Sequence, residues 1–258
     1  MSITNPADPP DLIRASQVLH PSQAAEWSPG LAPSGPIHGE IFAPADNASG
    51  AAASLAFALD HLGASVPDPL ADTPDERPWL WVQDREALRR TGRPYRPGLP
   101  RGLRHRLIHV ATRTPEDALF ALEEGLRCRE LAFVIGELTG NPRALDMTAS
   151  RRLGLAAEKH GVPFWLVRLD AKRDLSSARQ RWDVRAAASP EPRWNPAAPG
   201  VPSWRAELFR ARRHPPGTWV LRDDGKLVAE RPQGLERERV GEPLSPASVY
   251  PFDRSPRQ

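Results

Sequence analysis

The sequence contains one cysteine, Cys128, in 258 residues. A single thiol excludes a disulfide-stapled fold and a cysteine-based zinc site. No apolar run approaches the ~18–20 residues that span a bilayer. The first residues lack a basic segment followed by an apolar one, so we expect no signal peptide. The sequence therefore predicts a soluble, cytoplasmic protein without membrane contacts.

Lysine is also scarce, because the chain has only Lys159, Lys172 and Lys226. Almost all of the 35 positive charges are therefore arginines, and the net charge is only +3. That small excess does not by itself indicate nucleic-acid binding. The seven histidines show no HxH or HxxxH spacing, so we expect no metal site and no metal cofactor.

Apolar strand-like segments alternate with helical patterns between residues 37 and 188. The strands are expected at 39–43, 79–82, 106–111, 131–137, 162–169 and near 180–186. The helices are expected at 51–63, at 84–90, from a Thr114 cap onward, from Asn141 to Gly161, and near 174–180. Continuously apolar strands alternating with helices predict an α/β fold with a mostly parallel sheet covered on both faces.

The chain divides by composition into five parts. We expect a flexible arm at 1–36, the α/β core at 37–188, a Pro-rich linker at 189–202, a β-meander at 203–230 and a disordered tail at 231–258. Asp224-Gly225 lies between two apolar segments, which is the strongest short hairpin signal. The meander is therefore expected to be antiparallel.

The segment after the first strand has the setting of a phosphate-binding loop, with a strand, a Gly-containing loop and a small-residue helix. Such a loop needs a lysine for the β/γ-phosphates and a hydroxyl for Mg²⁺. Ala51 and Ala52 follow Gly50 where Lys-Thr is needed, and no lysine precedes residue 159. The loop, with Asn47 and Ser49 before Gly50, is therefore predicted to be degenerate and to bind no nucleotide cofactor.

The other positions of an ATPase site are altered too. The strand at 131–137 carries Gly136 where a metal-organising Asp is expected, with Glu137 next. Glu137 is either a functional acid or, more commonly for such a position, a helix-capping or solvated residue. The polar stretch 83–86 follows the strand at 79–82, but it has no phosphate to act upon. We expect no catalytic residue.

These segments, taken in order, resemble a known family. PSGPIHGEIFAPADNASGAAASLAFAL resembles the first strand–helix unit of the bacterial recombinase RecA with its lysine motif erased. WLWVQDREALRRTGRPY resembles the second strand of RecA and the segment that follows it. VIGELTGNPRALDMTASRRLGLAAEKHGVP and SWRAELFRARRHPPGTWVL are more closely similar to ImuA proteins, which are RecA-like accessory factors of SOS mutagenesis. The resemblance covers residues 36–230.

The resemblance implies a non-catalytic role in error-prone translesion DNA synthesis. ImuA-type proteins act with ImuB, a polymerase-like protein that lacks catalytic residues, and with an error-prone C-family DNA polymerase. The alternative is a DNA-binding modulator of the RecA recombinase or its filament. A residual nucleotide-binding enzyme is a third, weaker interpretation.

Positive charge concentrates in residues 85–106, which hold eight arginines and one acid. This segment has a net charge of +7, against −4 for the rest of the chain. Three interpretations stay open: a solvated loop, contact with an acidic protein, and contact with a DNA backbone. The residues predicted to bind nucleic acid or a partner are Arg89, Arg90, Arg93, Arg96, Arg101 and Arg104.

The meander supplies a second candidate surface. Tryptophan and arginine are enriched at the centres of protein interfaces. The predicted partner-binding residues are Trp204, Arg205, Phe209, Arg210, Arg212 and Trp219. Packing of the meander onto the core is the competing interpretation. Trp79, Trp81 and Trp165 are expected in the core, whereas one or two of Trp182, Trp194, Trp204 and Trp219 are expected to anchor an interface.

Overall fold

A computed structural model describes residues 38–64, 75–212, 214–224 and 227–230. The expected flexible arm at 1–36 and tail at 231–258 lie outside these residues. The strands are β1 (His38–Ala43), β2 (Trp79–Gln83), β3 (Leu107–Ala111), β4 (Val134–Thr139), β5 (Phe164–Leu169), β6 (Gln180–Ala186), β7 (Ser203–Ala211), β8 (Gly217–Asp223) and β9 (Leu227–Glu230). The helices are α2 (Ser49–Ala64), α3 (Arg85–Thr91), α4 (Pro115–Arg127) and α5 (Met147–His160), with short 3-10 turns at Arg96–Gly98 and Arg101–Leu103.

Within the described ranges, the nine strands form one sheet in the order β3-β2-β4-β5-β1-β6-β7-β8-β9. The strands from β3 to β6 are parallel to their neighbours. The strands from β6 to β9 are antiparallel. Both the parallel sheet and the C-terminal meander are therefore confirmed, and the hairpin at Asp224 joins β8 to β9.

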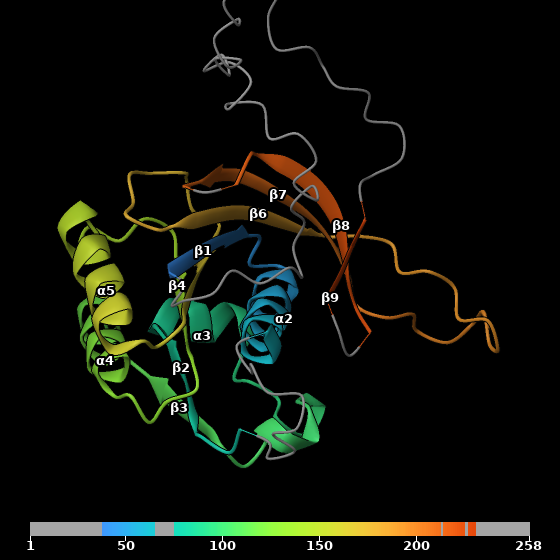
Figure 1. Ribbon diagram of the computed structural model, residues 1–258, viewed down its shortest axis with the longest axis horizontal. Coiled ribbons are helices and arrows are strands. Elements are labelled where there is room, and N and C mark those ends of the chain that lie inside the picture. The colour runs from blue at the N-terminus through green and yellow to red at the C-terminus, as the bar shows by residue number, and fades with distance from the viewer. Residues whose placement is uncertain (1–37, 65–74, 213, 225–226, 231–258) are drawn as a thin grey trace, which may run out of the picture.

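Helices cover both faces of the parallel part of the sheet (Figure 1). Phe57 of α2 stacks on Trp165 of β5 and packs beside Trp182 of β6, with ring centroids 5.1 and 5.0 Å apart. The opposite face packs against α4 and α5 through a second cluster that includes Leu122 and Leu153. Continuously apolar strands are needed here because both of their faces are buried.

Two of the expected helices differ from the structure. Helix α5 begins at Met147 rather than at Asn141, because the Asp146 carboxylate accepts a hydrogen bond from the Ala149 amide and caps the helix there. Asn141, which follows β4, instead forms hydrogen bonds with the backbone of Lys172, which follows β5. The helix expected near 174–180 is absent: residues 171–178 have no regular secondary structure, and the Ser176 hydroxyl donates to the buried Glu40. No helix in the described ranges has the length and apolar character that crossing a bilayer requires.

Candidate functional site

The loop between β1 and α2 lies at the carboxyl ends of the parallel strands, where open α/β sheets usually bind ligands. Asp170, which follows β5, holds this loop in place. Its amide donates to the Ala43 carbonyl at 3.0 Å, and its carboxylate accepts from the Ala45 amide at 3.1 Å. Arg90 of α3 reaches the same carboxylate at 2.8 Å. The loop is thus fixed between β5 and α3.

The start of α2 has the close packing of a phosphate loop but not its chemistry. A Cβ on Gly50 would lie 2.7 Å from the Ala43 Cβ and 2.8 Å from Val167 Cγ1, so only glycine lets the helix approach the strands. The Asn47 side chain already accepts from the Ser49 amide at 3.0 Å. Ala51 and Ala52 offer methyl groups alone, where a phosphate loop has the lysine and hydroxyl that contact phosphate and Mg²⁺.

A cavity of about 480 Å³ lies beside the loop. It is bounded by the first turns of α2, the ends of β2 and β4, and the segment after α3. Ala52, Leu55 and Trp81 form part of its apolar wall, while Arg93 and Tyr95 come from the segment after α3. Tyr95 is 75% exposed, and Arg93 is exposed as well. The cavity is therefore an apolar hollow with basic and aromatic groups beside it.

Glu137 also lines the cavity and is only 1% exposed. Its Oε2 accepts from Gln83 Nε2 at 2.8 Å and from Trp81 Nε1 at 3.2 Å. Its Oε1 has no hydrogen-bond partner among the described residues. Burial raises the pKa of Glu137, and the hydrogen bonds oppose that shift. The expectation of a helix-capping or solvated residue was wrong, because Glu137 is a buried acid at the cavity.

Gly136, which the sequence placed in the metal-organising position, lies on the other face of the sheet. A Cβ there would meet Leu122 of α4 at 2.9 Å and Leu166 at 3.0 Å. A side chain at that position would displace these leucine methyl groups and face α4, so an acid at residue 136 would not face the loop. The acid that strand β4 presents to the cavity is its neighbour, Glu137, since successive strand residues alternate between faces.

The polar stretch after β2 has structural roles. Gln83 bridges Glu137 and His109, whose Nε2 lies 2.8 Å from Gln83 Oε1. The Asp84 carboxylate caps α3 by accepting from the Ala87 amide at 2.7 Å. Burial raises the pKa of Asp84. The strand end is therefore held by side-chain hydrogen bonds rather than left open.

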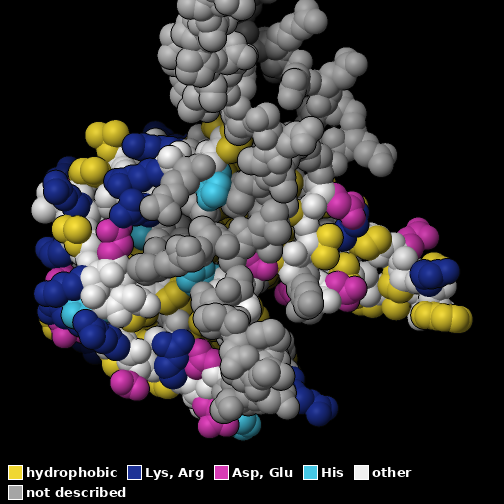
Figure 2. All heavy atoms as spheres, viewed as in Figure 1, with side chains coloured by type: hydrophobic (Ala, Val, Ile, Leu, Met, Phe, Trp, Pro, Cys, Tyr) yellow, Lys and Arg dark blue, Asp and Glu magenta, His cyan; other side chains and the backbone are white. Residues whose placement is uncertain are grey.

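Several of the predicted basic contact residues are engaged within the chain. Arg89 pairs with Glu86 at 2.6 Å, and Arg90 pairs with Asp170. Three more arginines donate to backbone carbonyls of the chain. Arg96 donates to Arg104 and Leu107, and Arg104 donates to Leu99. Arg106 donates to Gly102, Asp75 and Arg77. Arg85, Arg93 and Arg101 are exposed and bond to no residue that the structure describes. Figure 2 shows that basic side chains also gather over α4 and α5, which the sequence analysis did not single out.

The meander divides its predicted contact residues between two faces. Trp204 and Trp219 are buried in the core cluster that also contains Trp182, so they do not form an exposed surface. The predicted contact arginines of this region, Arg205, Arg210 and Arg212, are exposed. Phe209 is half-buried and lies under the Arg173 guanidinium, 4.0 Å from its ring centroid. The connection from β6 to β7 projects from the sheet (Figure 1) and carries Trp194, which is 98% exposed.

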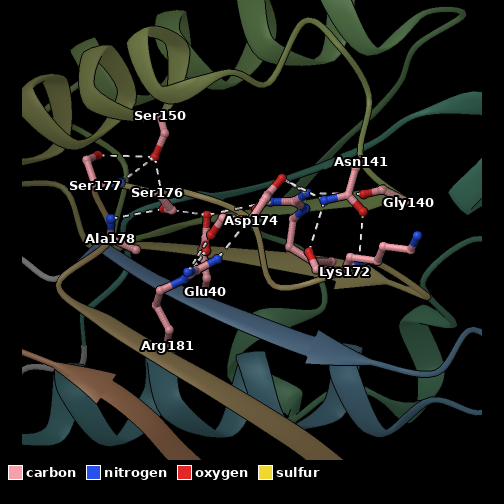
Figure 3. A network of polar contacts seen from close by, with 11 residues as sticks. Glu40, Gly140, Asn141, Ser150, Lys172, Asp174, Ser176, Ser177, Ala178 and Arg181 are labelled. Atoms are coloured by element: carbon pink, nitrogen blue, oxygen red, sulfur yellow. Dashed lines mark hydrogen bonds and ion pairs between the residues drawn. The ribbon is translucent and has the colours of Figure 1, made fainter. Parts of the chain in front are cut away.

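A buried ionic cluster near β1 was missed entirely by sequence reasoning (Figure 3). Glu40 accepts from Arg181 at 2.7 Å and from the Ser176 hydroxyl at 2.7 Å. Arg168 lies 3.8 Å from Glu40 and reaches Asp174 at 3.1 Å. The cluster ties the extended segment after β5 to the sheet. The one sequence signal was an acid inside the otherwise buried strand at 38–43.

Two curated proteins are similar to this chain. Both are named Protein ImuA and come from Caulobacter vibrioides, strains NA1000 / CB15N and ATCC 19089 / CIP 103742 / CB 15. Each is 36% identical over 127 residues, which is 45% of this chain and 50% of the relative, so the chain spans about half the length of the curated relatives it matches. No protein-family model matches the chain. The resemblance to ImuA proteins noted from the sequence motifs is confirmed over this part of the chain.

Proposed function

We propose that this protein is a non-catalytic accessory factor of SOS-induced, error-prone translesion DNA synthesis. The similarity to Protein ImuA carries the proposal. Its partners would be an ImuB-like, polymerase-related protein and an error-prone C-family DNA polymerase. The RecA-like scaffold would serve for protein contacts rather than for ATP hydrolysis.

The loop chemistry supports the non-catalytic part of this proposal. Ala51 and Ala52 supply neither cation nor hydroxyl, and exposed Asp46 adds a negative charge near the position of a nucleotide phosphate. Glu137 is held in place by hydrogen bonds from Trp81 and Gln83. A phosphoryl-transfer site relies on positioned cations, and this loop contains none of its own.

Complementation tests the proposal in cells. A Caulobacter vibrioides strain lacking Protein ImuA and carrying this chain should recover mutation induced by DNA damage. Asp84→Asn should complement equally well, because Asn also caps helices while it cannot act as a general base. Failure of the wild-type chain to complement would refute the accessory role. Loss of mutagenesis with Asp84→Asn in a folded, expressed protein would refute the non-catalytic part.

A second candidate is a DNA-binding modulator of the RecA recombinase. It is favoured by Arg85, Arg93 and Arg101, which form no hydrogen bond or ion pair with any described residue, because guanidinium groups bind phosphates well. Changing all three to Ala should weaken single-stranded DNA binding and lower the salt slope by about 0.7 per lost contact. Arg96→Lys serves as the control, since Arg96 already donates to backbone carbonyls. An unchanged salt slope in the triple variant would exclude these arginines as phosphate contacts.

A further inference from the structure

The cavity beside the degenerate loop has an unexplained feature, the unpartnered Oε1 of Glu137. Buried polar atoms in folded proteins are nearly always hydrogen-bonded, and an unpaired one is costly. The other carboxylate oxygen is already paired with Trp81 and Gln83. Because Glu137 lines the cavity, a molecule that occupies the cavity can supply the missing donor. A donor group of such a molecule would pair with this oxygen.

The walls of the cavity restrict the kind of occupant. Its volume of about 480 Å³ lies within the range of small-molecule and side-chain pockets. Ala52, Leu55 and Leu99 give it an apolar lining, and Trp81 adds an aromatic face. The best occupant is therefore a large, flat, apolar group that carries one N–H donor. The tryptophan indole has this combination.

Positive charge beside the cavity indicates which residues would flank the indole in a bound partner. Arg93 lines the cavity, is exposed and has no partner among the described residues, while Arg90 is shared with Asp170. Positive charge at this position repels a cationic occupant and attracts acidic neighbours. A lysine side chain would be the alternative donor for Glu137, and the charge of Arg93 disfavours it.

We propose that this cavity is an anchor site for a tryptophan side chain in an acidic segment of a protein partner. The indole N–H donates to Glu137 Oε1, the ring fills the apolar hollow, and flanking carboxylates pair with Arg93. The proposal rests on the proposed function, because it names the type of contact through which an accessory factor would bind. A site that no longer holds phosphate would in this way serve protein recognition.

A labelled peptide, acetyl-Asp-Glu-Trp-Glu-Asp-amide, tests the site by fluorescence anisotropy with the full chain. Replacing its Trp by benzothienylalanine, which has the same shape without the N–H, should weaken binding about tenfold. Equal affinity for the two peptides would overturn the hydrogen bond to Glu137. Tighter binding of a Lys-centred peptide would show that the cavity takes a cation instead.

Protein variants locate the binding. Glu137→Leu should abolish the preference for Trp over its analogue. Because that variant changes a buried residue, Ala48→Trp at an exposed cavity position provides a second test by filling the entrance. Arg93→Glu should weaken binding of the acidic peptide severalfold. Arg129→Glu should leave this binding unchanged, because Arg129 is exposed and lies outside the cavity lining. Unchanged binding by Ala48→Trp and Arg93→Glu would overturn the proposal.

Competition distinguishes a peptide from a small ligand. Adenosine and AMP should not displace the peptide at micromolar concentration, and displacement by either would reassign the cavity to nucleotides. The measurement needs only the purified chain. Absent peptide binding by a chain that complements mutagenesis would reject the anchor site while leaving the proposed function standing.

Discussion

His38 makes the stability of this protein dependent on pH. It lies buried at the start of β1, stacked on Phe164 with ring centroids 5.1 Å apart. Neither ring nitrogen has a hydrogen-bond partner among the described residues. Burial, reinforced by the charges of Arg179 and Arg181, lowers the pKa of His38 from 6.5 to about 3. The folded protein therefore keeps this imidazole neutral.

The sign and size of the effect follow from linkage. The unfolded chain takes up a proton on His38 below about pH 6.5, whereas the folded chain does so only near pH 3. Stability is therefore lost as the pH falls from 6.5 toward 3, at about 1.4 kcal/mol per pH unit. Between pH 7 and pH 5, His38 alone should reduce the free energy of unfolding by about 2 kcal/mol.

Urea unfolding at pH 7 and pH 5 measures this contribution. His38→Leu removes the titrating group, so the wild type should lose about 2 kcal/mol more than the variant over this interval. Other titrating groups, including His61 and His109, are common to both proteins. His105→Leu is the control, because it removes an exposed histidine instead of the buried one. Parallel pH profiles for the wild type and His38→Leu would refute the reasoning.

Three further predictions concern the loop, the ionic cluster and the meander. Calorimetry should detect no micromolar Mg-ATP binding. The double variant Ala51→Lys, Ala52→Thr should release no phosphate from ATP, because Glu137 at the cavity stays buried and hydrogen-bonded. Measurable turnover would contradict this prediction. Arg181→Met should lower the free energy of unfolding by about 3–5 kcal/mol, because Glu40 stays buried without this ion-pair partner. Adding Glu40→Gln should restore part of the lost stability in denaturant titrations. Equal stability of the single and double variants would count against this prediction. Deleting residues 203–258 should abolish cooperative thermal unfolding by circular dichroism, because it removes β7, one of the two neighbours of β6, and exposes the core. A sharp transition would instead show an independent core.

The last of these predictions follows the interpretation in which the meander packs onto the core. The segment 189–202 has a linker composition, but it joins β6 to β7, which are neighbouring strands of one sheet. Trp204 and Trp219 complete the cluster around Trp182. Composition reports local flexibility, whereas pairing across a sheet depends on contacts that composition does not record.

The sequence by itself determined the order and type of most elements. The apolar runs at 79–82 and 162–169 fixed buried strands, Thr114 and Pro115 fixed the start of α4, and Asp224 with its glycine fixed the last hairpin. These signals are local, because strand burial, helix capping and turn geometry each depend on a few adjacent residues. The absence of Lys-Thr after Gly50 was visible for the same reason, since the residues of a phosphate loop are contiguous.

Only the tertiary structure decided which side chains meet. Glu137 faces the cavity and Gly136 faces α4 because neighbouring strand residues point to opposite faces, and the sequence does not say which face borders the loop. Arg96 and Arg85 look alike in the sequence, yet one donates to backbone carbonyls and the other is free of described partners. Glu40 and Arg181 are 141 residues apart along the chain and form a buried ion pair. Each of these outcomes depends on distant segments brought together by the sheet order, which local residue patterns do not encode.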